Sequence, residues 1–293
     1  MTLQFETVRV KRILTPAEAD AYLGDGVPDL APNVTTPTLA VDDDTDEPVA
    51  AYLPLENVAT LRRAVVGTPM GGVQRSQAFR SRSRTFGAAP RKPAMRRDSC
   101  RMTALFNEAP ERHRVLADFA NQLGSLLNQV YPARPDIDRQ TLGVVLPEWR
   151  MGEERLWTSG VINQSAALPY HRDNFNFKTW SAMPVIRRGM RGGHLSIPEY
   201  GLTLACADGT ASFFCGRELV HGVTPLRPVQ EDGYRYSVVY YALRGMKDCY
   251  TAAVESQYGR TKRTERERAM AQRLKAGDTS IPGTNRKSNP KES

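Results

Sequence analysis

The sequence contains few of the residues that build zinc sites or disulfide frameworks. It has four histidines and four cysteines among 293 residues. The cysteines form no CxxC pair and follow no regular spacing, which argues against a zinc knuckle and a cysteine-rich secreted scaffold. We therefore expect four buried free thiols, at Cys100, Cys206, Cys215 and Cys249.

Long hydrophobic runs are also absent. No apolar segment approaches the roughly 20 residues needed to cross a bilayer. The first residues, MTLQFETVRVKRIL, contain no apolar segment following a basic one, as a secretory signal would. We expect a soluble, intracellular protein without a membrane partner, located in the host cytoplasm if it is viral, and monomeric. Its 40% hydrophobic residues are sufficient for a sizeable core.

Positive charge is abundant, and it is concentrated in two segments. The net charge is +8. Residues 71–102 contain nine Arg/Lys and one Asp, and residues 259–293 contain ten Arg/Lys and four Asp/Glu. Clustered cations favour a polyanion partner, because they release condensed counterions from a phosphate backbone. For the C-terminal segment, a purely solubilising role is an equal alternative.

Several local patterns predict secondary structure in the first 140 residues. LTPAEADAYL predicts a helix with Thr15 as N-cap, Pro16 at the first position and Glu18 completing a capping box. TPTLAVDDDTDEPVAAYLPL predicts two strands around an acidic turn. Apolar residues at three- and four-residue steps predict a long helix over 110–131, with His113 on its surface. Residues 71–102 are interpreted as a basic loop.

The second half changes to short strand-like runs separated by Gly, Pro and Asp. These runs include TLGVVL, TSGVINQ, GGHLSIPEYGLTLACADGTASFFCG, LVHGVTPL and YRYSVVYYAL. The fold class is therefore α+β, with a jelly-roll core and supporting helices. We divide the chain into a supporting region (1–140), a jelly-roll catalytic core (141–258), and a basic C-terminal helix with a disordered tail (259–293).

The stretch LPYHRDNFNF raises the question of a metal site. His171 and Asp173 supply two of the three ligands of a two-histidine, one-carboxylate iron site, but this spacing alone is a weak signal. His221 is the candidate for the third ligand, because it lies where an apolar strand ends in a turn.

The segment RYSVVYY contains an arginine that is expected to be buried and to bind an anion. Arg235 and Ser237 share one strand face, and Tyr236, Val238 and Tyr240 share the other. An arginine facing into an apolar barrel requires an anion, and a dicarboxylate co-substrate would supply one. Arg235 could instead pair with a buried carboxylate.

Four motifs together resemble the motifs of one enzyme family. HRDNFN, GGHLSIPEYG, HGVTPL and RYSVVYY, within residues 157–246, resemble the TET/J-binding-protein branch of the iron(II)/2-oxoglutarate dioxygenases, in particular its compact bacteriophage members. The resemblance implies a double-stranded β-helix, Fe(II), 2-oxoglutarate and dioxygen as cofactors and co-substrates, and hydroxylation of a base methyl group in DNA. DNA would then be the partner of the basic loop and the C-terminal tail.

The resemblance also implies roles for individual residues. His171, Asp173 and His221 would bind iron, and Arg235 and Ser237 would bind 2-oxoglutarate. Asn176 would hydrogen-bond the target base and Tyr241 would pack against it, although Asn176 could simply cap a turn. Asn163 is included as a substrate contact because it precedes the metal strand, and His194 is interpreted as structural. Leu243 stands where the animal enzymes have a base-reading histidine.

Four hypotheses about the function remain, in order of preference. The first is a DNA 5-methylcytosine dioxygenase, and thymine in DNA is the nearest alternative because its methyl group occupies the same ring position. The third hypothesis is an oxygenase of the same fold that acts on a protein or a small molecule. The fourth is a nucleic-acid-binding jelly roll with an inert iron site.

Overall fold

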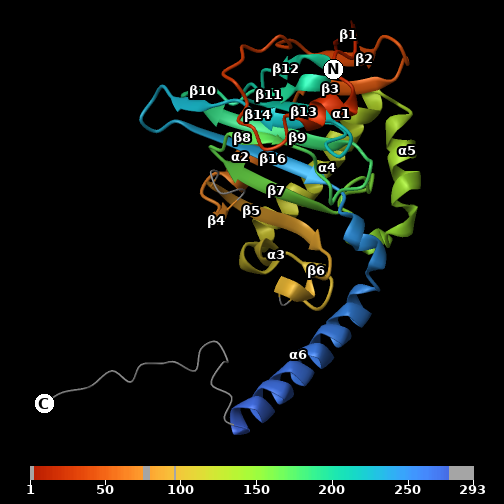
Figure 1. Ribbon diagram of the computed structural model, residues 1–293, viewed down its shortest axis with the longest axis vertical. Helices are drawn as coiled ribbons and strands as arrows, with labels where there is room; N and C mark the ends of the chain where they lie inside the picture. Colours follow the sequence, from red (N-terminus) through yellow and green to blue (C-terminus); the bar gives the residue numbers. More distant parts are fainter. Residues whose placement is uncertain (1–2, 75–79, 96, 277–293) are drawn as a thin grey trace, which may run out of the picture.

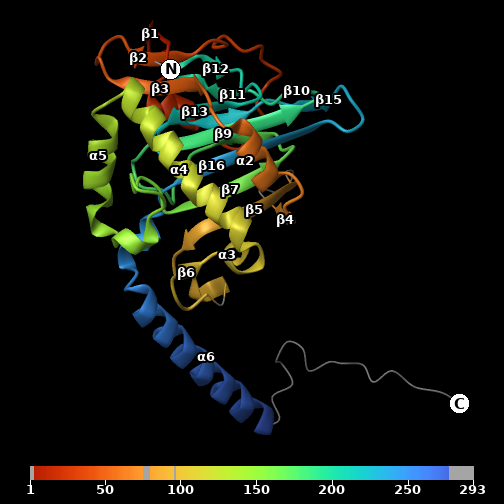
Figure 2. The same cartoon turned by 180° about the vertical axis from the view of Figure 1, so that it is seen from behind.

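The computed structural model describes residues 3–74, 80–95 and 97–276. The helices are α1 (Pro16–Asp20), α2 (Val58–Val65), α3 (Ala104–Glu108), α4 (Pro110–Val130), α5 (Arg134–Thr141) and α6 (Ala252–Lys275). Two β-sheets face each other, and α2, α3 and α4 pack on the outer face of the larger sheet (Figures 1 and 2).

The larger sheet has ten strands in the described part of the chain. Their spatial order is β1 (Glu6–Val10), β2 (Thr38–Asp42), β3 (Pro48–Pro54), β13 (Thr210–Phe214), β9 (Ser181–Arg188), β16 (Tyr234–Tyr241), β7 (Ser159–Gln164), β5 (Arg80–Ala89) and β4 (Gly71–Gln74), and β6 (Arg101–Met102) pairs with the end of β5. Strands from both sides of residue 140 therefore share this sheet, and the three-part division of the chain stays a prediction.

The smaller sheet has four described strands and contains two of the three metal candidates, His171 and His221. Its order is β12 (Leu202–Leu204), β11 (Leu195–Ile197), β14 (His221–Val223) and β8 (Leu168–His171), and a separate ribbon pairs β10 (Met190–Gly192) with β15 (Leu226–Pro228). This arrangement of two facing sheets with supporting helices confirms the predicted α+β jelly roll.

Strand alternation separates two hydrophobic cores. In β3, Ala51 and Leu53 belong to the core under the helices, whereas Ala50 and Tyr52 belong to the core between the sheets. Figure 2 shows α4 crossing the back of the larger sheet. Burial of each leucine of its apolar stripe contributes about 1.5–3 kcal/mol. These leucines are Leu116, Leu123, Leu126 and Leu127.

Three predictions in the first 140 residues are confirmed. Thr15 and Glu18 form the capping box of α1. Strands β2 and β3 pair antiparallel around the acidic turn. The long helix is α4, which differs from its predicted end by one residue.

Other predictions are wrong, each for a local reason. Much of the basic loop forms strands β4, β5 and β6, because alternating Arg and Ser suit a strand with one exposed face. The expected strand at TLGVVL contains a 3₁₀ turn, Leu142–Val144. His113 is buried: its Nε2 accepts a hydrogen bond from the Gly87 amide at 3.1 Å, and burial lowers its pKa.

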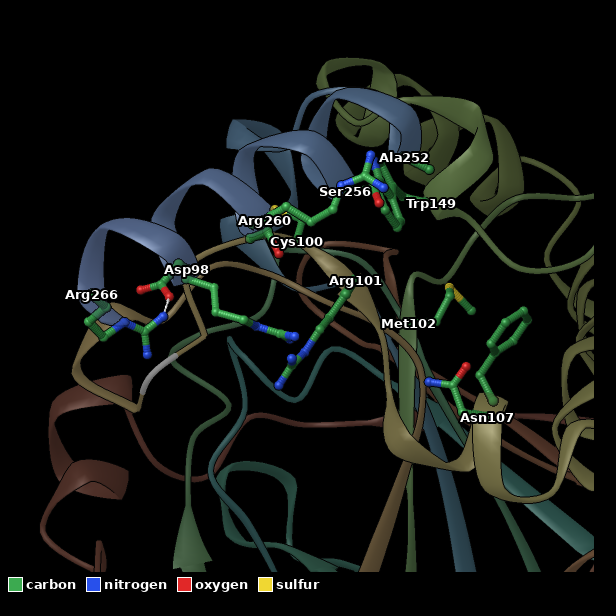
Figure 3. Close-up of a pocket in the computed structure, with 14 residues that line it drawn as sticks. Asp98, Cys100, Arg101, Met102, Asn107, Trp149, Ala252, Ser256, Arg260 and Arg266 are labelled. Carbon is green, nitrogen blue, oxygen red and sulfur yellow. Dashed lines mark hydrogen bonds and ion pairs between the residues drawn. The ribbon is translucent and has the colours of Figure 1, made fainter. Parts of the chain in front are cut away.

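Helix α6 begins at Ala252, seven residues before the expected basic segment, and extends away from the sheets in both views (Figures 1 and 2). Its first turns border a cleft against the segment that carries β6 (Figure 3). The predicted disordered tail, the last sixteen residues, lies outside the described residues. No described helix is both long and apolar enough to span a membrane.

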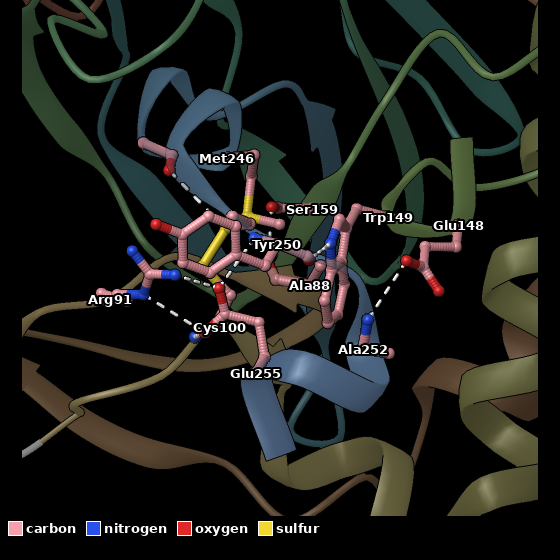
Figure 4. Close-up of a disulfide and its surroundings, with 12 residues drawn as sticks. Ala88, Arg91, Cys100, Glu148, Trp149, Ser159, Met246, Tyr250, Ala252 and Glu255 are labelled. Carbon is pink, nitrogen blue, oxygen red and sulfur yellow. Dashed lines mark hydrogen bonds and ion pairs between the residues drawn. A yellow bond between two sulfur atoms is a disulfide. The ribbon is translucent and has the colours of Figure 1, made fainter. Parts of the chain in front are cut away.

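The expectation of four free thiols is wrong for two cysteines. Cys100 and Cys249 form a disulfide across 149 residues of sequence (Figure 4). Beside it, the buried Glu255 carboxylate accepts hydrogen bonds from the Cys100 and Tyr250 amides, both at 2.8 Å, and pairs with Arg91. Distant cysteines are brought together by tertiary structure, which spacing in the sequence does not reveal. Cys206 and Cys215 are buried and free as expected.

Removing this disulfide is expected to destabilise the protein. Because the closed loop is long, replacing Cys249 by serine should lower the free energy of unfolding by about 2–5 kcal/mol in urea titrations without reductant. Reductant should lower the wild type to the level of the variant. Thiol titration of unreduced, denatured wild type should find two thiols, and four would contradict the pairing.

Candidate metal centre

His171 and His221 face each other across two paired strands. His171 ends β8 and His221 begins β14, and the two residues are direct partners in the antiparallel register. Their ring centroids lie 4.3 Å apart. The strand pairing therefore brings together two histidines that are 50 positions apart in the sequence.

Asp173 completes the cluster from the turn after β8. Its Oδ1 lies 3.9 Å from His171 Nε2, and its Oδ2 lies 4.0 Å from His221 Nε2. The turn is held in place because the Asp173 amide donates to the Gly216 carbonyl at 2.8 Å. One ligand atom from each of the three residues lies within 4.8 Å of the others.

Both imidazoles are oriented for metal binding. His171 Nδ1 lies 2.8 Å from the Pro169 carbonyl, and His221 Nδ1 lies 3.0 Å from the Leu219 carbonyl. A carbonyl only accepts, so each Nδ1 carries the proton and each Nε2 presents its lone pair to the cluster. Burial, reinforced by neighbouring His171, lowers the pKa of His221 to about 4, which keeps this ring neutral at pH 7.

The space for an ion depends on a glycine. A Cβ at Gly216 would lie 2.6 Å from Asp173 Oδ2, so the carboxylate would have to shift, and 3.1 Å from His221 Cε1, a tight contact. The donor set of two imidazoles and one carboxylate suits non-haem iron(II) and leaves other coordination positions open. The residues present therefore fit the predicted metal.

A cavity of about 330 Å³ extends from the cluster. Ser237 and Asn163 line one wall, where β16 and β7 place them opposite each other in register. Asn176 and Tyr241 line another part, and Asn176 also forms a bridge with Leu243. The strongly exposed Phe175 stands at its edge, 77% accessible. The cavity thus gathers seven predicted site residues: Asn163, His171, Asp173, Asn176, His221, Ser237 and Tyr241.

Arg235 is the exception, because it does not line this cavity. It is fully buried on the same β16 face as Ser237, while Tyr236, Val238 and Tyr240 face the helices. Its three guanidinium nitrogens have no hydrogen-bond partner among the described residues. Burial lowers its pKa, and the Cys206 thiol is a close neighbour. The alternative of a buried carboxylate partner is therefore wrong for the described residues.

His194 lies outside the cavity, as its structural interpretation requires. Its Nδ1 is 2.7 Å from the Ala205 carbonyl, and its amide donates to Thr224 Oγ1 at 2.9 Å. These contacts tie the strand β11 to its neighbours.

Glu199 is a site residue that the sequence patterns did not reveal. It is fully buried, accepts a hydrogen bond from the Val220 amide at 2.8 Å, and pairs with Arg172 at 3.1 Å. Val220 immediately precedes one predicted metal ligand, and Arg172 lies between the other two. The Glu199 carboxylate therefore contacts both segments that carry the predicted metal ligands. The available signal was a glutamate within the motif GGHLSIPEYG.

Replacing Glu199 by glutamine is expected to weaken metal binding about 10- to 100-fold, the usual effect of removing an outer partner of metal ligands. The amide keeps the hydrogen bond from Val220 but loses the ion pair with Arg172, which is then held by Asp20 and by backbone carbonyls. Cobalt(II) titration, with cobalt as a visible substitute for iron(II), measures the affinity. Glu218→Gln, at an exposed neighbouring position, is the control, and equal affinities in both variants would contradict the positioning role.

Comparisons with known proteins give the fold. No protein-family model and no curated protein matches the chain. The structure described as NgTET1 in complex with 5mC DNA is similar to 72% of this chain and 78% of that chain, with 18% identity and a TM-score of 0.52. An oxidoreductase of the 2OG-Fe(II) oxygenase family from Burkholderia pseudomallei aligns less well, with 15% identity, coverage of 67% and 88%, and a TM-score of 0.46. The chain shares the fold of the NgTET1 structure.

Proposed function

We propose that this protein is an iron(II)/2-oxoglutarate-dependent dioxygenase that hydroxylates the methyl group of 5-methylcytosine in DNA. The observation that carries the proposal is the His171, Asp173 and His221 cluster, with both Nε2 atoms facing the carboxylate. A buried arginine without an internal anion, on the β16 face that carries Ser237, supports the same assignment. The predicted monomeric state is kept as part of the proposal.

His171, Asp173 and His221 would hold the metal. With 2-oxoglutarate and dioxygen, bound iron(II) supplies oxidative decarboxylation of the co-substrate and hydroxylation of the substrate methyl group. The backbone carbonyls of Pro169 and Leu219 keep the protons on Nδ1, and the fixed tautomers keep both ligands available.

Arg235 and Ser237 would bind the distal carboxylate of 2-oxoglutarate. A guanidinium can donate two parallel hydrogen bonds to one carboxylate, and the Ser237 hydroxyl can add another. The bound dicarboxylate would supply the anion that the buried arginine lacks. Asn163, the register partner of Ser237, lines the same cavity and would contact the substrate.

The target base would enter the cavity from the side marked by Phe175. Asn176 is proposed to hydrogen-bond the base and Tyr241 to pack against it. His221 is buried, and stacking inside a duplex would keep the methyl group away from the cluster, so the base would have to be flipped out, at a cost of about a few kcal/mol. The similarity to a fold determined with 5mC DNA supports DNA as the substrate class.

Nucleoside mass spectrometry tests directly which base the enzyme hydroxylates. DNA containing 5-methylcytosine and, separately, unmodified DNA containing thymine are incubated with enzyme, iron(II), 2-oxoglutarate and ascorbate. We expect 5-hydroxymethylcytosine from the first DNA and no change in the second. Oxidised thymine without oxidised 5-methylcytosine would reassign the base, and no modified base despite succinate formation would reject DNA as substrate.

A further inference from the structure

A second cavity, separate from the metal centre, lies between α6 and the segment around β6. It encloses about 690 Å³ and is lined by four arginines and one aspartate, a formal charge of +3. Figure 3 shows Arg101 and Arg260 entering it from different walls, β6 and α6. The cationic cleft, as we name it, is formed by residues 98–102, Phe106, Asn107, Trp149 and one face of α6 from Ala252 to Arg266.

Among the residues that the structure describes, most of this positive charge has no counterion. Arg266 pairs with Asp98. Within the described residues, the side chains of Arg101, Arg260 and Arg263 take part in no hydrogen bond or ion pair. Three unpaired guanidinium groups around one cleft repel one another, and an external anion would remove that repulsion.

The walls of the cleft are fixed. The disulfide between Cys100 and Cys249 ties the β6 segment to the chain that enters α6. Glu255, in the first turn of α6, accepts a hydrogen bond from the Cys100 amide and pairs with Arg91. The cleft is therefore an ordered feature, which lowers the entropic cost of binding an extended ligand.

A hairpin connects the cleft with the entrance of the metal cavity. Lys92 and Arg97 exchange backbone hydrogen bonds, and Arg97 precedes the β6 strand by four residues. The Lys92 ammonium lies 6.0 Å from the ring centroid of Phe175, at the edge of the metal cavity. Arg97 lies close enough to Arg101 and to Tyr241 for electrostatic interaction with both. Cationic residues thus continue from the metal cavity to α6.

We infer that the cationic cleft binds the phosphate backbone of the DNA strand that flanks the base in the metal cavity. Arginine suits this ligand, because its guanidinium donates paired hydrogen bonds to phosphate oxygens and releases condensed counterions. The inference rests on the proposed function in one respect, that DNA is the substrate. It adds that α6 and the β6 segment, beyond the metal cavity, set how the DNA lies on the protein.

Helix α6 offers a matched control. Arg260 and Arg263 line the cleft, whereas Arg268 and Lys275 lie further along the same helix, do not line the cleft, and are exposed. Arg260→Gln/Arg263→Gln and Arg268→Gln/Lys275→Gln remove the same charge from the same helix. Differences between these two variants therefore report the position of the charge.

Fluorescence anisotropy with labelled DNA across a salt series measures binding without any chemistry. Each lost phosphate contact should reduce the slope of log K against log salt by about 0.9, so the cleft variant should lose about two units of slope. The control variant should lose less than about one. Equal losses in both variants, or no loss in either, would overturn the inference.

A second arm tests the connection to the metal cavity. Turnover is compared on a long oligonucleotide with the 5-methylcytosine at its centre and on a trinucleotide, which has one nucleotide on each side of the target base. The cleft variant should raise KM only on the long DNA, with kcat unchanged, and an equal effect on both would overturn the inference. If DNA binding follows the cleft but no base is oxidised, the cleft stands and the proposed reaction fails.

Discussion

Replacing Arg235 by methionine is expected to abolish 2-oxoglutarate binding while leaving the unliganded protein at least as stable as the wild type. Arg235 is fully buried, and among the described residues its guanidinium pairs with no carboxylate; the Cys206 thiol is its close neighbour. An uncompensated buried charge is costly, and hydrophobic replacement of buried ionic groups is neutral or stabilising by about 1–4 kcal/mol. This combination of lost function and unchanged or higher stability distinguishes a ligand site from a structural arginine.

Thermal unfolding with and without 2-oxoglutarate, in the presence of manganese(II), measures both effects. At one hundred times its dissociation constant, the ligand should stabilise the wild type by about 2.7 kcal/mol and leave the Arg235→Met variant unaffected. Arg187→Met is the control, because Arg187 is the register partner of Arg235 but donates to the carbonyls of Gly192, at 2.8 Å, and Met190. Its loss should destabilise the protein. A destabilised Arg235→Met variant that still binds 2-oxoglutarate would contradict the assignment.

Replacing Asp173 by alanine is expected to eliminate metal-dependent turnover. The carboxylate lies about equally far from both Nε2 atoms, and it is the one anionic ligand of the proposed set. Removing outer partners of metal ligands already costs about 10- to 100-fold, so loss of a direct ligand should exceed about 100-fold in metal affinity. Iron(II) titration and succinate formation measure the two effects.

The thermal stability of the metal-free Asp173→Ala variant distinguishes loss of the metal ligand from misfolding. Without metal, Asp173→Ala should unfold at nearly the wild-type temperature, because the Asp173 backbone amide keeps its bond to the Gly216 carbonyl. Asp232→Ala, at an exposed residue paired with Arg188, is the control and should keep full activity. Wild-type metal affinity in Asp173→Ala would place the metal elsewhere.

The sequence predicted much of the candidate site because its chemistry depends on short-range patterns. The His-x-Asp spacing places His171 and Asp173 on a strand and its turn, and alternation in RYSVVYY places Arg235 on the inner face of β16. Contacts between segments that are distant in the sequence could not be predicted from such local patterns. Glu199 acts through Val220 and Arg172, contacts that arise only when β11, β14 and β8 assemble.

In the fold as well, elements that depend on local patterns were predicted, and contacts between distant segments were not. The capping box of α1 and the apolar stripe of α4 are local, and both were predicted with nearly correct bounds. Strand β9 was missed because Pro184 interrupts its pattern, although the residue lies between β13 and β16 in the larger sheet. The pairing of Cys100 with Cys249 depends on tertiary structure across 149 residues.

The most direct test of the proposed reaction is its stoichiometry. Succinate and 5-hydroxymethylcytosine are quantified in one reaction with iron(II), 2-oxoglutarate and DNA containing 5-methylcytosine. We predict one succinate for each hydroxymethyl group during the first turnovers, and neither product with Asp173→Ala. Hydroxymethylation that persists in Asp173→Ala or without 2-oxoglutarate, or succinate formation that DNA does not increase, would contradict the proposed reaction.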